Sequence, residues 1–362
     1  MYRVFHQDQA VLDSRPLFVV GTGRCGSTLI SNMLREHPSV LSLSELFAFV
    51  TDLGSLIPQA FPKGNIDANQ FWSIVGGMYH KQNLMIRYGI EMNEMLYPFH
   101  PTSRFTRETG VPALLQTTLP HLTSDHDAFF DEVRQFVLSL PPAPIEQQYL
   151  HLFEWLRWRF GRRLWVERSG GSLRIVHRFH QLFNNARFIH IIRDGRDCAI
   201  SMSRHYGFRM VLLAFQLTEI LNGDPFESDD RSGMEDLSDE LFPFLPEHFD
   251  ADAFRRYETS PSLCGHYWSG EIIAGLRTLA QLSPQRLLTL HYEEFLADPI
   301  AAARKLITFI DPALVDETWI RQAASLVRSA SSSWKTLPLR EQKLLEAACR
   351  PGFEALRSFE AA

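Results

Sequence analysis

The sequence has few cysteines and no long apolar run. Its four cysteines, at positions 25, 198, 264 and 349 of 362 residues, lie far apart, so they have neither the spacing of a metal site nor the density of a disulfide scaffold. No stretch approaches the roughly 18 apolar residues that cross a bilayer, and the first ten residues contain no apolar signal core. These absences predict a cytoplasmic protein without a membrane span.

The chain also has no excess of positive charge. The chain has 36 Lys and Arg residues against 42 Asp and Glu residues, which argues against a broad nucleic-acid-binding surface. Twelve of the acidic residues, but only three arginines, lie in residues 224–258, so the rest of the chain is mildly basic. This distribution suits a small polyanionic ligand held in one cleft, and it predicts that residues 224–258 form an acidic surface loop or lid.

Short apolar runs and helical patterns alternate along the chain. The runs that predict buried strands are residues 17–20, 40–43, 164–166, 187–192 and 287–292. Strands that alternate with helices predict one α/β domain over residues 1–362, with a parallel sheet flanked by helices. Residues 51–150 are rich in Met and aromatic residues, and they predict a largely helical insertion that covers the active-site edge and lines an apolar acceptor pocket.

A glycine-rich loop, GTGRCGST, begins at Gly21, directly after the first apolar run and before a helical pattern. Its glycines let backbone N–H groups approach a phosphate, and the N-terminus of the next helix favours an anion. Gly26 and Thr28 match the Walker A spacing, but Ser27 replaces the lysine and the cation is Arg24. The loop predicts a P-loop-like fold, and the missing lysine argues against a kinase or nucleotidase that uses ATP and Mg²⁺, which stays the alternative.

A second motif, RFIHIIRDGRDCAISM, ends at Met202. Arg193 is expected at the carboxyl end of a strand, and Ser201 follows two turns into the next helix, so both side chains are expected to reach one phosphate. Two separate phosphate sites fit a bisphosphorylated nucleotide better than a triphosphate. In the alternative, Asp194 ends a Walker B strand and binds Mg²⁺.

Together the two motifs resemble those of sulfotransferases that use 3′-phosphoadenosine 5′-phosphosulfate (PAPS). The similar branch has an arginine in the loop and includes tyrosylprotein sulfotransferases and many bacterial enzymes. The resemblance covers parts of residues 17–50, 164–205 and 286–336. It implies that Arg193 and Ser201 bind the 3′-phosphate of PAPS and that the loop binds its 5′-phosphosulfate, with no metal. The loop residues are Gly23, Arg24, Cys25, Gly26, Ser27 and Thr28.

Glu45 is the expected catalytic base. It follows the second predicted strand, and so is expected at the carboxyl edge of the sheet, beside the loop. It also lies 21 residues after Arg24, which is the spacing of the glutamate base in the arginine-loop sulfotransferases. The resemblance implies that Glu45 takes the proton of the acceptor hydroxyl and that Arg24 stabilises the leaving 5′-phosphate. A histidine base, as in other branches, stays open, and its candidates are His121, His177, His180 and His205.

Three further residues complete the predicted nucleotide site. Arg168 follows a predicted strand in WVERSGGSL, and Trp334 and Lys335 end SASSSWK, which resembles the loop that closes over the nucleotide. The sequence thus predicts a sulfotransferase that acts on a small-molecule or carrier-bound hydroxyl of an apolar or amphipathic acceptor. A non-catalytic nucleotide-binding protein is the third interpretation.

Overall fold

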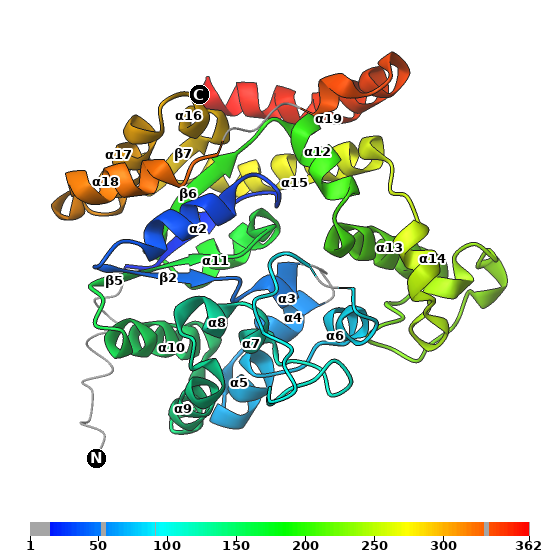
Figure 1. Ribbon diagram of the computed structural model, residues 1–362, viewed down its shortest axis with the longest axis horizontal. Coiled ribbons are helices and arrows are strands. Elements are labelled where there is room, and N and C mark those ends of the chain that lie inside the picture. The colour runs from blue at the N-terminus through cyan, green and yellow to red at the C-terminus, as the bar shows by residue number, and fades with distance from the viewer. Residues whose placement is uncertain (1–14, 52–55, 91, 329–332, 362) are drawn as a thin grey trace.

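A parallel five-stranded sheet forms the centre of the computed structural model, which describes residues 15–51, 56–90, 92–328 and 333–361 (Figure 1). The strand order is β2-β5-β1-β6-β7, and every neighbouring pair is parallel. The strands are β1 (Leu17–Val20), β2 (Val40–Ser44), β5 (Leu164–Arg168), β6 (Arg187–Ile192) and β7 (Leu287–His291). The predicted α/β fold is confirmed, and each strand ends within two residues of its predicted limit.

Helices surround the sheet and bury both of its faces. All side chains of β1 and β2 are buried, as expected for parallel strands between helical layers. Helix α2 (Ser27–Arg35) packs on β2, with Ile30, Met33 and Leu34 buried. The helices that follow β5, β6 and β7 are α11 (Val176–Leu182), α12 (Gly195–Ser203), α13 (Tyr206–Leu221), α15 (Pro261–Leu279), α16 (Tyr292–Ala297), α17 (Pro299–Ile310), α18 (Glu317–Ser325) and α19 (Leu339–Glu360).

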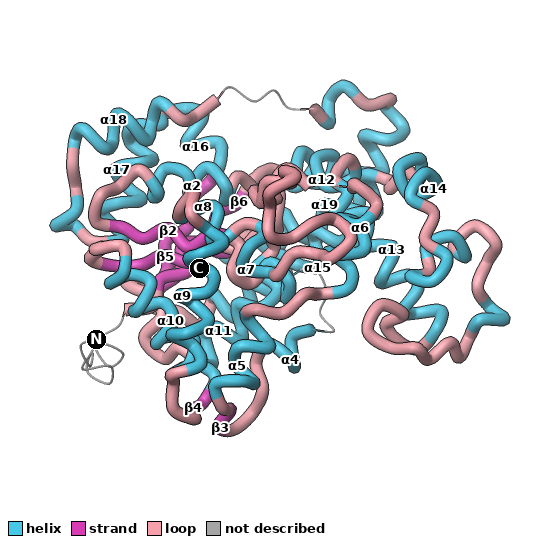
Figure 2. Tube along the Cα trace, turned by 60° about the horizontal axis from the view of Figure 1, so that its bottom comes forward, coloured by secondary structure: helices cyan, strands magenta, loops and turns pink. Residues whose placement is uncertain are grey.

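Between β2 and β5 the chain forms a series of helices and a small two-stranded antiparallel sheet. The elements between β2 and β5 are α3 (Ala48–Thr51), α4 (Ile57–Ala60), β3 (Asn65–Ile66), α5 (Ala68–Val75), α6 (His80–Arg87), α7 (Ala113–Gln116), α8 (Thr118–Leu122), α9 (His126–Leu138), β4 (Ala143–Pro144) and α10 (Ile145–Arg159). Figure 2 shows α4, α5, α9, β3 and β4 below the sheet. Helix α8 packs on β2, so part of this segment lies against the edge of the sheet, where β2 is the outermost strand.

The acidic segment 224–258 packs around a core of its own. Helix α13, α6 and this segment share a second cluster of buried apolar residues, separate from the main core. The segment contributes Phe226, Phe244, Leu245, Phe249 and Phe254. Its short helices are η3 (Met234–Asp236), η4 (Phe242–Phe244), η5 (Pro246–His248) and α14 (Ala251–Arg256), and Figure 1 shows α14 beside α13, away from the sheet. A lid role for this segment stays a prediction.

No helix in the described part of the chain combines the length and the hydropathy that a membrane crossing requires.

Glu167, on β5, carries a fully buried carboxyl group. The Ser169 hydroxyl donates a hydrogen bond to its Oε1 at 2.6 Å. Burial, reinforced by the nearby charge of Glu45, raises the pKa of Glu167 from 4.5 to about 8. Between these two pKa values Glu167 stays protonated in the native state, whereas it is ionised in the unfolded chain. The free energy of unfolding is therefore expected to fall by up to ~1.4 kcal/mol per pH unit between about pH 5 and pH 8 from this group.

Urea titrations of the wild type and the neutral Glu167→Gln variant at several pH values measure this effect. The glutamine keeps an acceptor for Ser169 but has no proton to lose, so the variant is expected to gain stability relative to the wild type as the pH rises toward about 8. A constant difference between the two proteins over this pH range would contradict the prediction.

Candidate active site

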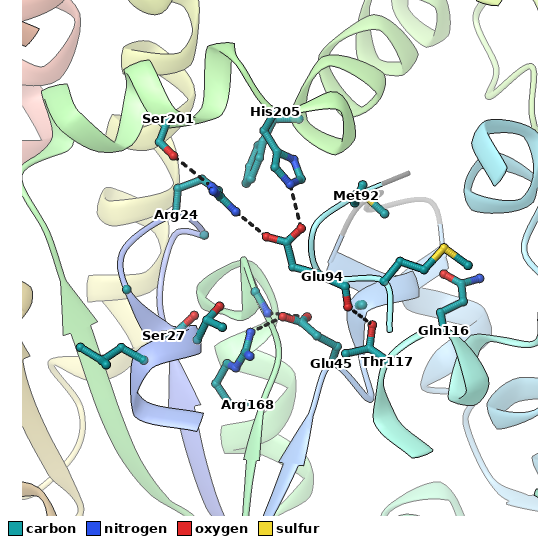
Figure 3. A pocket seen from close by; sticks show the side chains of 18 of the residues that line it. Arg24, Ser27, Glu45, Met92, Glu94, Gln116, Thr117, Arg168, Ser201 and His205 are labelled. Atoms are coloured by element: carbon teal, nitrogen blue, oxygen red, sulfur yellow. Dashed lines mark hydrogen bonds and ion pairs between the residues drawn. The ribbon is translucent and has the colours of Figure 1, made fainter. Parts of the chain in front are cut away.

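A cavity of about 310 Å³ lies at the carboxyl edge of the sheet. Its walls come from the segments that follow β1, β2, β5 and β6, together with residues from the insertion between β2 and β5. This edge, where the strand order changes direction around β1, is where open α/β sheets bind ligands. Figure 3 shows the polar side chains that meet in the cavity.

The loop after β1 is shaped to bind an anion. Gly23 and Gly26 have φ values of +77° and +94°, which favour glycine. A Cβ atom at Gly26 would collide with the Tyr292 ring, and one at Gly23 would approach the Phe208 ring within 2.6 Å. No side chain caps the start of α2, so the N-terminus of this helix, which begins at Ser27, can offer backbone N–H groups to a ligand.

The structure places five of the six predicted loop residues on the cavity wall: Gly23, Arg24, Gly26, Ser27 and Thr28. Cys25 is the exception, because its side chain is 1% exposed and lies against Gly21, beneath the loop. Burial raises the pKa of the Cys25 thiol. The Cys25 side chain therefore has no access to a ligand in the cavity, and its backbone is the part that belongs to the loop.

Arg193 and Ser201 both reach the cavity, as the spacing predicts. The Arg193 guanidinium lies 5.0 Å from the centre of the Tyr292 ring, and its Nη1 donates to the Arg24 carbonyl oxygen at 3.3 Å. Ser201 accepts a hydrogen bond from Arg24 Nε at 3.1 Å. The end of β6, α12 and the loop after β1 are thus joined through Arg24.

Asp194, the residue of the alternative magnesium site, lies outside the cavity. Its side chain caps α12, accepting from the Arg196 backbone N–H at 2.9 Å, and it forms an ion pair with the Arg196 guanidinium at 2.7 Å. In the described part of the chain there is no group of three His, Cys, Asp or Glu residues placed to hold a metal ion.

Glu45 and Arg168 form a buried ion pair, with side chains 8% and 4% exposed. Arg168 also donates to the Ser44 hydroxyl at 2.8 Å, and the Gly170 N–H donates to Glu45 Oε2 at 2.9 Å. These contacts fix the Glu45 carboxylate at the cavity wall and leave further lone pairs on both oxygens. Arg168 lies where the sequence predicts, but its charge is directed at Glu45, and its role toward a nucleotide stays a prediction.

The backbone at Arg24 and Glu45 is strained. Their φ values are +53° and +59°, in a region that side chains larger than glycine rarely occupy. Asn222, at the end of α13, is the third such residue in the described part of the chain. Conformations of this kind cost on the order of 1–3 kcal/mol and concentrate at functional sites, so both strained residues of the cavity coincide with the predicted catalytic pair.

Glu94 is a site residue that sequence reasoning missed. It forms an ion pair with Arg24 and accepts from His205 Nε2 at 2.9 Å through its other oxygen (Figure 3). Burial by itself raises the pKa of Glu94, but the hydrogen bond and charge of His205 and the charge of Arg24 outweigh it and hold the pKa at about 2. Glu94 belongs to a Met-rich run with no motif, so no pattern in the sequence marked it.

Of the four candidate histidines, His205 lines the cavity. His121 is buried outside it, where burial and the charges of Arg35 and Arg168 lower its pKa to about 4. His177 and His180 lie on α11, also outside the cavity, and burial lowers the pKa of His177. His205 is thus the histidine that the fold brings to the site.

Trp334 and Lys335 lie outside the cavity. Trp334 is buried under the Arg196 guanidinium, which lies 3.9 Å from the centre of its ring, and the Trp334 backbone N–H donates to Asp197 Oδ1 at 3.3 Å. Lys335 is exposed. Most of the predicted closing loop, residues 329–332, falls outside the described residues, so its role over a nucleotide stays a prediction.

The insertion between β2 and β5 supplies the wall opposite the loop after β1. Thr117 donates to the backbone carbonyl oxygen of Glu94 at 2.8 Å, which ties the Glu94 segment to α7 and α8. The apolar residues on this wall are Phe49, Met92, Met95 and Ala113, and its polar residues are Gln82, Gln116 and Thr117. The cavity therefore has a basic side and a mixed, largely apolar side.

Comparisons with known proteins agree on one family. A family model described as a sulfotransferase domain matches residues 143–338, and a second, described as a sulfotransferase family, matches residues 16–75. These two ranges contain the loop after β1, Glu45, Arg168, Arg193 and Ser201. A search of curated proteins returned no match.

Several solved structures of sulfotransferases are similar to this chain. The sulfotransferase domain from the curacin biosynthetic pathway is 14% identical, with a TM-score of 0.44, over 92% of this chain and 90% of that one. A sulfotransferase from Mycobacterium avium is 16% identical, with a TM-score of 0.42, over 94% and 78%. One from Alicyclobacillus acidocaldarius is 17% identical, with a TM-score of 0.39, over 95% of each chain.

Proposed function

The chain belongs to the sulfotransferase family, whose domain model matches more than half of it, and we propose that it transfers a sulfuryl group from PAPS to an acceptor hydroxyl. The observation that carries this proposal is the meeting of two phosphate-binding elements in one cavity with a carboxylate, Glu45. The loop after β1 offers backbone donors, and Arg193 with Ser201 offers a second anion site. A nucleotide with phosphates at both its 3′ and 5′ positions fits two such sites.

In this proposal PAPS binds through two groups of residues that line the cavity. Arg193 and Ser201 bind the 3′-phosphate, and the N–H groups around Ser27 bind the 5′-phosphosulfate. Arg24 lies between these elements, so its guanidinium stabilises the charge that develops on the 5′-phosphate as it leaves. A fixed donor at such a position contributes roughly 3–4 kcal/mol to lowering the barrier.

Glu45 is the proposed base. The acceptor oxygen forms a bond to sulfur while the bond from sulfur to the 5′-phosphate oxygen breaks, and the acceptor proton passes to the Glu45 carboxylate. Arg168 and the Gly170 N–H hold this carboxylate in place. The wall with Met92 and Met95 binds the remainder of an apolar or amphipathic acceptor, which is a small molecule or a carrier-bound hydroxyl.

Calorimetric titration tests the donor class. Adenosine 3′,5′-bisphosphate, the product left by PAPS, is expected to bind without metal in the micromolar range, because it fills both phosphate sites. ATP with Mg²⁺ in the same buffer is expected to bind weakly, since Ser27 replaces the lysine that holds the β- and γ-phosphates. Metal-dependent ATP binding without bisphosphate binding would overturn the proposal and favour a kinase or nucleotidase.

A further inference from the structure

Glu94 forms an ion pair with Arg24, the residue proposed to contact the 5′-phosphosulfate of PAPS. Its Oε1 pairs with Arg24 Nη1, while its Oε2 accepts from His205 Nε2 at 2.9 Å. Arg24 and Glu94 are 27% and 25% exposed, so the pair faces the cavity and is not part of the core. The segment that carries Glu94 comes from the acceptor side, 70 residues along the chain from Arg24.

Under the proposed function the 5′-phosphosulfate needs the same guanidinium. Arg24 Nε is bonded to Ser201 and Nη1 is paired with Glu94, so a donor anion that binds this guanidinium meets the face that already carries the Glu94 carboxylate. Two anions on this one face repel each other. We propose that Glu94 is an exchangeable counter-ion of Arg24: it holds Arg24 in the empty enzyme, gives it up to the donor's 5′-phosphosulfate, and takes it back when the nucleotide product leaves.

The surroundings of Glu94 permit this exchange without unfolding. Thr117 holds the Glu94 backbone at 2.8 Å, and His205 holds the second carboxylate oxygen. A rotation of the side chain therefore releases Arg24 while one hydrogen bond is kept. The carboxylate is ionised throughout the physiological pH range, since its pKa is held at about 2, so it competes with the donor at every working pH.

The exchange also links the two substrates. Met92 and Met95, on either side of Glu94, line the acceptor wall. When the donor displaces Glu94 from Arg24, the released carboxylate and His205 face the acceptor side of the cavity. After transfer, the return of Glu94 to Arg24 offsets part of the binding free energy of the bisphosphate and speeds its release.

Titration of the Glu94→Gln variant tests this inference, which rests on the proposed function. Glutamine keeps an acceptor for Arg24 but removes the competing charge, so adenosine 3′,5′-bisphosphate is expected to bind about 5- to 10-fold more tightly than to the wild type. Its dissociation rate, measured by stopped flow, is expected to fall by a similar factor. Adenosine 3′-monophosphate, which lacks the 5′ anion, is expected to bind both proteins equally.

Glu271→Gln is the matched control. Glu271 forms an ion pair with Arg174 at 3.0 Å outside the cavity, so its removal changes the net charge equally and is expected to leave bisphosphate affinity unchanged. Equal bisphosphate affinity in the wild type and Glu94→Gln, or a gain that adenosine 3′-monophosphate shares, would overturn the inference and leave the proposed function standing. Failure of both proteins to bind the bisphosphate would overturn both.

Discussion

Replacing Glu45 by glutamine is expected to lower kcat by about 10²- to 10⁴-fold. The glutamine carbonyl still accepts from Arg168, but the amide cannot take the proton of the acceptor hydroxyl. The affinity for adenosine 3′,5′-bisphosphate is expected to stay within a few-fold of the wild type, because Glu45 is proposed to act on the acceptor. Turnover is measured with a hydroxyl acceptor that the wild type sulfates, and affinity is measured by calorimetry.

Two further variants make the Glu45 result specific. Glu45→Asp keeps the charge but withdraws the carboxylate from the Gly170 N–H and the acceptor, so an intermediate loss of turnover is expected. Glu154→Gln alters another buried, arginine-paired glutamate, which lies outside the cavity, and is expected to keep wild-type turnover. If Glu45→Gln keeps wild-type kcat, another residue is the base, and His205 is the next to test.

Replacing Arg193 by alanine is expected to weaken adenosine 3′,5′-bisphosphate binding by roughly 10- to 100-fold. The variant loses the charge-assisted hydrogen bonds that we propose for the 3′-phosphate, and bonds of this kind contribute about 1.5–3 kcal/mol. Adenosine 5′-monophosphate, which has no 3′-phosphate, is expected to bind the variant and the wild type similarly. Calorimetric titration with both nucleotides measures this difference.

Arg204→Ala is the control for Arg193. Arg204 follows the C-terminus of α12 and is exposed, so its loss removes the same charge near the opposite end of this helix without removing a cavity group. Bisphosphate affinity is expected to stay near that of the wild type. Unchanged affinity in Arg193→Ala, or an equal loss for both nucleotides, would contradict the assignment of Arg193 to the 3′-phosphate.

The central sheet could be predicted because its strands are buried on both faces. Such strands have continuous apolar runs, and in a parallel sheet their carboxyl ends meet at one edge. Loop residues near Gly26, and also Arg193, could be placed at this edge because they follow β1 and β6, and Ser201 could be placed there because it lies on the helix that comes next after β6. Local sequence determined their positions, so spacing was sufficient to bring them together.

Contacts between distant segments could not be predicted in this way. Arg168 was expected at the site, but its pairing with Glu45 depends on β2 and β5 being neighbours in the sheet. Glu94 lies in an insertion without a motif, and its position depends on how α7 and α8 pack. The acidic segment 224–258 showed its charge in the sequence, whereas its buried phenylalanines form a core only with α6 and α13.

The sequence by itself determined the order of the strands along the chain and the glycine-rich loop after β1. It also determined that Arg24, Glu45 and Arg193 follow strands and that Ser201 lies on the helix after β6, because these positions depend on residues close together in the chain. The tertiary structure decided which charges neutralise one another. Arg24 pairs with Glu94, Glu45 with Arg168, and His205 alone among the four candidate histidines reaches the cavity. These pairings join residues 70 to 123 positions apart, and packing of whole elements, which no local pattern encodes, brings them within hydrogen-bond distance.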